Sequence, residues 1–208
     1  MEAATEIEME FRLTYAGDLF AHRSRISNRS LHVHDIRKKF HEQLKKLWNE
    51  HPVFEQDDSG GSILLESSVS SIGETFEFGD FKWQPIVTKR NGLMCELDIL
   101  MLRDGRPGRV QTDIDNRLKI IFDALRMARD MQELGEKTAE GKRTPKPEEI
   151  PFFVLLEDDN LISRVSVTSD MLLEPVAATN PKAAVRLIIN VTVRPYKVTW
   201  DNSGFVGS

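Results

Sequence analysis

Three segments of this chain alternate apolar and polar residues with a period of two, so each predicts a β-strand with one buried face. In chain order, the apolar faces comprise Ile7, Met9, Phe11, Leu13 and Tyr15, then Leu93, Cys95, Leu97, Ile99 and Met101, then Val185, Leu187, Ile189, Val191 and Val193. One-sided strands need a common cover, which helices at about 35–49 and from 115 onward can supply. We therefore predict an α+β fold, a mixed β-sheet with helices packed mainly on one face.

The connections between these elements are predicted from turn residues and polarity. Asn91-Gly92 is a hairpin signal that would pair the strand starting at 93 back onto Lys82–Val87. The segment 131–150 is polar, rich in Lys, Glu, Gly and Pro, and predicts a mobile insertion. We expect a single domain over 1–195, with 196–208 as a peripheral tail.

The composition is that of an intracellular protein. No run of 18 apolar residues is present, and the first ten residues are acidic where a secretory signal would be basic and then apolar. The single cysteine, Cys95, lies in an apolar strand pattern, which favours a core position over a nucleophile. We expect a cytoplasmic protein with no membrane partner.

Residues 113–125, DIDNRLKIIFDAL, combine two nearby carboxylates with the start of an amphipathic helix. Asp115 is suited to be the N-cap, with Asp113 ending the preceding segment. Two close carboxylates repel each other unless one is protonated or a hard cation lies between them, and oxygen ligands favour magnesium, manganese or calcium. The alternative is that both acids are solvated turn and cap residues.

A second acidic cluster lies at 155–160, LLEDDN, between an apolar run and a strand-like segment. If this junction packs beside the helix start, one of its carboxylates would complete a cup of three metal ligands. A surface turn is the alternative, because Asp-Asp-Asn is also favourable turn chemistry.

The motif Asp113, Asp115, Asn116 and Lys119, followed by Asp123-Ala124-Leu125, resembles the RusA family of Holliday-junction resolvases. The resemblance is dense over 113–125, moderate over 155–168 and architectural elsewhere. Family spacing to Leu161 and Ile162 places the later acid at Asp158, with Asp159 as the competing position. The 131–150 segment departs from the family's short connection.

The resemblance implies magnesium-dependent hydrolysis of phosphodiesters in branched DNA, with manganese as a possible substitute and a homodimer acting on a four-way junction. It assigns Asp113, Asp115 and Asp158 as the metal ligands. Lys119 would stabilise the phosphate in the transition state or orient the water. The supporting residues around them would be Asn116, Asp123, Glu157 and Asp159. Asp123 could also hold Lys119 through their (i, i+4) spacing.

Basic residues that could contact DNA occur in two places, although the net charge is −5. Residues 22–46 contain eight Lys or Arg against two acids, a local charge of +6. The second place is the turn DGRPGR, whose arginines should lie near Asp113. The candidate phosphate contacts are Arg23, Arg25, Arg29, Lys38, Lys39, Arg103, Arg106 and Arg109.

Each of these basic groups has an ordinary alternative. Arg37, Lys38, Lys45 and Lys46 could merely solvate the outer face of a helix, and the arginines of the turn could pair with the carboxylates when no metal is bound. Two other function classes also stay open. One is a nuclease for another structured DNA or RNA, and the other is a non-catalytic nucleic-acid-binding or assembly subunit with the same fold.

Overall fold

The computed structural model describes residues 9–21, 29–51, 54, 75–105, 114–134, 144–199 and 202. Its helices and strands are β1 (Met9–Asp18), α1 (Arg29–Glu50), β2 (Phe76–Phe78), β3 (Phe81–Val87), β4 (Leu93–Arg103), α3 (Ile114–Leu125), β5 (Phe152–Leu156), β6 (Ile162–Met171) and β7 (Ala184–Pro195). Short 3-10 helices are η2 (Met131–Leu134), η3 (Pro147–Glu149), η4 (Asp159–Leu161) and η5 (Pro181–Ala183). None of the described helices is both long and apolar enough to cross a membrane.

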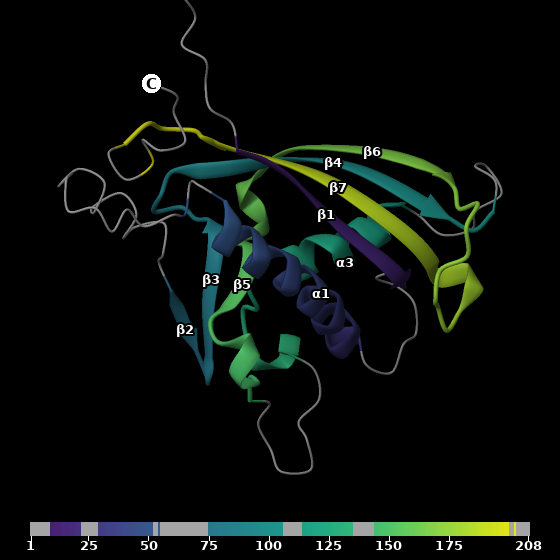
Figure 1. Cartoon of the computed structure of the whole chain (residues 1–208), viewed down its shortest axis with the longest axis horizontal. Helices are drawn as coiled ribbons and strands as arrows, with labels where there is room; N and C mark the ends of the chain where they lie inside the picture. Colours follow the sequence, from purple (N-terminus) through teal and green to yellow (C-terminus); the bar gives the residue numbers. More distant parts are fainter. Residues whose placement is uncertain are drawn as a thin grey trace, which may run out of the picture.

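The strands form two mixed sheets, which confirms the α+β class. The larger sheet has the order β1-β7-β4-β6, antiparallel except for the parallel β4-β6 pair. The smaller sheet has the order β2-β3-β5, in which β2-β3 is antiparallel and β3-β5 parallel. Helices α1 and α3 lie on one face of the larger sheet, with the smaller sheet beside them (Figure 1). The prediction of one sheet was therefore too simple.

The predicted apolar faces form the core between the larger sheet and the helices. All five predicted positions in β4 and all five in β7 are buried, as are Met9 and Leu13 of β1. Phe11 and Tyr15 pack partly buried against the same cluster, while Ile7 lies outside the described residues. A period of two thus identified the buried side of each strand correctly.

The predicted hairpin between β3 and β4 is wrong. The chain does turn there, since Gly92 has φ 61° and its N–H donates to Lys89 O at 3.0 Å. After the turn, however, β4 pairs with β7 and β6, whereas β3 pairs with β2 and β5. Phe81 and Trp83 hold β3 in a separate aromatic core with Phe152, whose ring lies 4.9 Å from that of Trp83. Packing of these rings decided the partner of β3, and the turn residues did not.

Helix α1 covers the predicted 35–49 segment and starts earlier, at Arg29. Within it, the interpretation of Arg37 as a solvated outer residue is wrong, because this side chain is fully buried. Its Nε donates to Arg126 O at 3.0 Å and its Nη2 to Asp123 O at 2.6 Å, and the guanidinium lies over the Trp83 ring. Arg37 thereby satisfies carbonyls at the C-terminal end of α3 that the helix itself leaves without partners.

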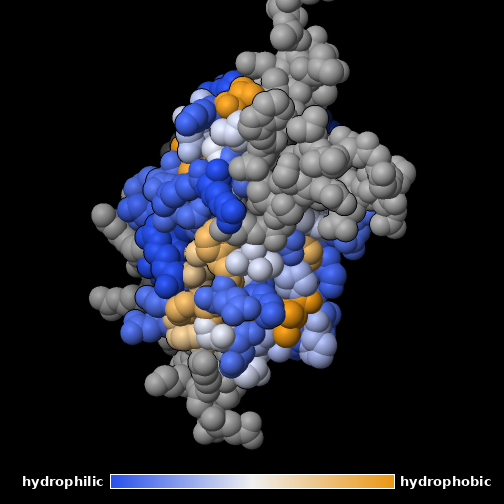
Figure 2. All heavy atoms as spheres, turned by 90° about the vertical axis from the view of Figure 1, so that its left-hand side faces the viewer, coloured by the Kyte–Doolittle hydropathy of each residue, from blue (hydrophilic) through white to orange (hydrophobic). Residues whose placement is uncertain are grey.

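The segment 131–150 is structured at both of its ends, and 135–143 lie outside the described residues. At one end η2 buries Leu134, and at the other Glu149 of η3 forms an ion pair with Lys38 at 2.9 Å. In the tail after Pro195, Asn202 is buried and its Nδ2 donates to Asn91 O at 2.7 Å. The face at the left of Figure 1 is mostly hydrophilic where it is described, with small separate hydrophobic patches (Figure 2).

Candidate functional site

Helix α3 presents the charged residues of the motif along one side. Asp115, Lys119 and Asp123 follow one another at a spacing of four residues, so they lie on neighbouring turns of one helix face. Asp115 and Lys119 are exposed, and in the described part of the chain neither forms a hydrogen bond or ion pair. Asp115 lies inside the first turn, so its assignment as the N-cap is wrong by at least one residue. Asp113 lies just outside the described residues.

The opposite side of the same first turn enters the protein. Asn116 and Arg117 are buried, and Arg117 Nη2 donates to Lys182 O at 2.9 Å. Burial lowers the pKa of Arg117, and the nearby charge of Arg103 lowers it further. Arg103 at the end of β4 is itself buried, which does not favour it as a DNA contact in this arrangement. The hydrogen bond to Lys182 O anchors the start of α3 beside η5, which precedes β7.

Asp123 is engaged by two arginines and not by Lys119. Its Oδ1 accepts from Arg126 Nη2 at 2.7 Å and its Oδ2 from Arg29 Nη2 at 3.0 Å. The predicted pairing of Asp123 with Lys119 is therefore wrong. The physical reason is that the Arg126 side chain is only 3% exposed and needs a countercharge more than the solvated Lys119 does.

Arg126 has a second carboxylate partner in η2. Its Nη1 and Nη2 donate to the two carboxylate oxygens of Glu133 at 2.9 and 2.8 Å, a bidentate geometry. Burial alone would lower the pKa of Arg126, but Glu133 and Asp123 outweigh it and the pKa is raised. Burial would likewise raise the pKa of Glu133, but the hydrogen bond from Arg126 outweighs it and the pKa is lowered. The network ties the end of α3 to η2.

The acidic cluster 157–159 forms a turn bound by basic residues. Arg129 Nη2 donates to Asp158 Oδ2 at 3.3 Å and to Asp159 Oδ1 at 2.9 Å. Asp158 is also the N-cap of η4, because its Oδ1 accepts from Asn160 N at 3.0 Å. Burial alone would raise the pKa of Asp158, but the Asn160 N–H and Arg129 hold it below its ordinary value.

The three acids do not alternate sides as they would in an extended strand. Asp158 and Asp159 share Arg129, whereas Glu157 Oε2 accepts from Lys89 N at 2.8 Å on another side. The reason is that β5 ends at Leu156 and η4 begins at Asp159, so the cluster lies beyond the strand's period of two.

The two acidic clusters lie beside opposite ends of α3. Met127 N donates to Leu156 O at 2.9 Å, which fixes the turn next to the residues that follow the helix. Asp115 is ten residues before the last residue of α3, and a rise of 1.5 Å per residue separates these ends by about 15 Å. The described residues thus do not bring Asp158 to Asp115. Nor do they contain any group of three or more His, Cys, Asp or Glu side chains suited to a metal ion.

The remaining basic candidates divide into three groups. Arg29 and Lys38 are committed to ion pairs with Asp123 and Glu149, whereas Lys39 is exposed. Four candidates lie outside the described residues, namely Arg23, Arg25, Arg106 and Arg109.

Sequence reasoning missed the arginines Arg37, Arg126 and Arg129 that hold the motif and the acidic turn. The spacing of three between Asp123 and Arg126 is a helical pairing signal that could have identified one of them. The partners of the other two lie far away in the sequence, so no local pattern points to them.

No family model, curated protein or solved structure matches this chain. The similarity to the RusA family therefore rests on the motif residues alone.

Proposed function

We propose that this chain is a magnesium-dependent endonuclease that cleaves phosphodiesters in branched DNA, a four-way junction above all, as a homodimer. One observation carries the proposal: the first turns of α3 hold Asp115 and Lys119 exposed on one face, while Asn116 and Arg117 between them are buried. Asp123 and Asp158 are held by arginine partners. In the described part of the chain, Asp115 and Lys119 have none.

The donor set fits a magnesium ion. Magnesium binds through one or two protein carboxylates and keeps several waters, so Asp115 and Asp113, two positions earlier in the sequence, would be enough. Asp158 is not part of this pair, because Arg129 holds it beside the other end of α3. A bound magnesium would supply an activated water and neutralise charge on the attacked phosphate.

Lys119 has a separate role in this proposal. One turn beyond Asp115, its ammonium group would bind a non-bridging oxygen of the attacked phosphate and stabilise the charge that develops there. The exposed Lys39 would contact the DNA backbone away from the reacting phosphate, together with Arg23 and Arg25. Those contacts would set affinity and its salt dependence, whereas Asp115 and Lys119 would set the rate.

The decisive experiment measures thermal unfolding with and without magnesium or manganese. A metal that binds only the folded protein raises its melting temperature, and the rise grows with the logarithm of the ratio of free metal to Kd. The wild type should show this rise, and the Asp113→Asn/Asp115→Asn variant should not. Asp159→Asn is a matched control with one carboxylate fewer elsewhere, and it should keep the rise. An equal rise in the double variant would show that Asp113 and Asp115 do not bind the metal.

Cleavage assays on synthetic four-way junctions, flaps and linear duplexes test the reaction itself. Asp115→Asn and Lys119→Ala should lose most activity on the junction, and Asp115→Asn should bind DNA at least as tightly because a negative charge is removed. Parallel loss of binding and cleavage in Asp115→Asn would give Asp115 a structural role. Cleavage of flaps or RNA in preference to junctions would change the proposed substrate but would keep the proposed metal-dependent hydrolysis.

A further inference from the structure

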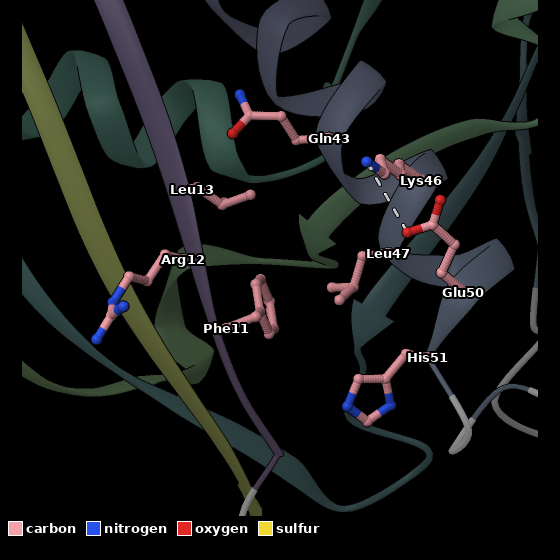
Figure 3. Close-up of a pocket in the computed structure, with 8 residues that line it drawn as sticks. All are labelled: Phe11, Arg12, Leu13, Gln43, Lys46, Leu47, Glu50 and His51. Atoms are coloured by element: carbon pink, nitrogen blue, oxygen red, sulfur yellow. Dashed lines mark ion pairs between the residues drawn. The ribbon is translucent and has the colours of Figure 1, made fainter.

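An open groove of about 390 Å3 lies between β1 and the second half of α1. Its walls are formed by Phe11, Arg12 and Leu13 of β1 and by Gln43, Lys46, Leu47 and Glu50 of α1, with His51 at one end (Figure 3). The helix residues follow the spacing of a single helix face. The floor is apolar, because Leu13 is buried and Phe11 and Leu47 are packed partly buried beside it.

Strand β1 is an edge strand of the larger sheet, so one row of its backbone groups faces away from β7. Gln43 identifies which residues belong to that row. Its Oε1 accepts from Thr14 N at 2.9 Å and its Nε2 donates to Thr14 O at 2.8 Å. The side-chain amide of Gln43 therefore binds Thr14 as a neighbouring strand would.

Further backbone groups along the β1 edge are therefore exposed in and beside the groove. The β1-β7 register is regular, and in an antiparallel ladder alternate residues direct their N–H and C=O groups outward. Because Thr14 faces outward, so do Arg12 and Glu10. The Arg12 side chain leaves the groove, since its Nε donates to Asn190 Oδ1 at 2.7 Å on the other side of β1. Arg12 thus offers its backbone to the groove, and no described residue bonds to the outward groups of Arg12 or Glu10.

Charge indicates which strand would fit. The last turn of α1 contains no basic residue, and Glu50 lies there. The C-terminal end of a helix carries a partial negative charge, so a cationic side chain is favoured at this end of the groove. Lys46 lies one turn earlier and forms a long ion pair with Glu50 at 3.9 Å, which is weak because both side chains are largely exposed.

We propose that this groove binds an extended peptide as an added strand on β1, with apolar side chains directed at Phe11 and Leu47 and a Lys or Arg near Glu50. The backbone groups of Arg12 and Glu10 supply affinity, and the apolar floor selects alternate side chains. Such a peptide site is independent of the nuclease chemistry proposed for α3.

Amide hydrogen exchange of the full-length protein tests the free edge directly. Without peptide, the amides of Arg12 and Glu10 should exchange much faster than those of Leu13 and Thr14. A fluorescein-labelled peptide of alternating valine and threonine that ends in two lysines should bind and protect both amides. The same peptide ending in two glutamates should bind at least about fivefold more weakly.

Arg12→Pro removes the outward N–H without removing a ladder hydrogen bond, a position where edge strands tolerate proline. It should weaken binding of the lysine peptide about fivefold, whereas the control Arg12→Ala should not. Equal affinity of the two variants would overturn the proposal, as would slow exchange at Arg12 and Glu10 in the free protein or no protection by the lysine peptide at millimolar concentration. Protection that grows with protein concentration alone would make a second copy the occupant and would also overturn it.

Discussion

Replacement of Asp123 by Asn separates a structural role of this motif residue from a catalytic one. The carboxylate joins Arg126 at 2.7 Å and Arg29 at 3.0 Å, and neither contact involves Lys119 or Asp115. An asparagine has almost the same shape but can accept from only one of the two arginines, and its NH2 group would face the other. We therefore expect the variant to lose stability and to keep its response to metal.

The magnitude follows from the exposure of the two arginines. A hydrogen bond to a charged group contributes about 1.5–3 kcal/mol when it is buried. The Arg126 side chain is 3% exposed but keeps both bonds to Glu133, so we assign about 1.5 kcal/mol to its contact with Asp123. The Arg29 side chain is 36% exposed, which reduces its contact to about 0.5 kcal/mol. The sum is about 2 kcal/mol, or about 4–8 °C in melting temperature for a chain of this length.

Urea unfolding monitored by circular dichroism measures this loss. The matched control is Glu77→Gln, which removes the carboxylate of an exposed ion pair with Lys82 at 3.3 Å and should change stability by less than about 0.5 kcal/mol. If Asp123→Asn were as stable as Glu77→Gln, the reasoning about the buried arginine would be refuted. If it were stable but no longer responded to magnesium, Asp123 would belong to the metal site.

Three further predictions concern pH and the acidic turn. The pKa of Glu133 is lowered in the folded protein. The carboxylate therefore contributes stability above its ordinary pKa of 4.5, and this contribution is lost as pH falls through the folded pKa. Glu133→Gln should flatten this part of the plot of stability against pH. The pKa of His41 is lowered, chiefly by burial, and its Nδ1 accepts from Phe153 N at 2.9 Å. Stability should therefore fall below pH 6.5 as the ring gains a proton. Urea unfolding at pH 7 and 5 should show a smaller fall in His41→Gln. Asp158→Asn should keep its N-cap and its magnesium response but lose its ion pair with Arg129. Loss of the metal-induced melting shift in this variant would return Asp158 to the set of ligands.

Local periodicity was enough to predict much of the fold. The buried faces of β1, β4 and β7, the existence of α1 and α3 and the α+β class all follow from where apolar residues recur. A period of 2 or 3.6 determines which side of an element is apolar, because it depends only on backbone geometry. The proximity of Asp115 to Lys119 was accessible for the same reason, since both lie on one helix.

The partners of these elements were decided by tertiary packing. The turn residues at 91–92 did not indicate that β3 belongs to a second sheet. An apolar strand face predicts that the strand is buried, but it does not predict which distant surface covers it. The charged residues were also ambiguous in sequence. Arg37 is buried because it meets the end of α3, and Asp158 faces Arg129 because β5 ends beside the C-terminal end of that helix. A charge is buried or exposed according to partners that lie far along the chain, and those partners become neighbours only when the chain folds.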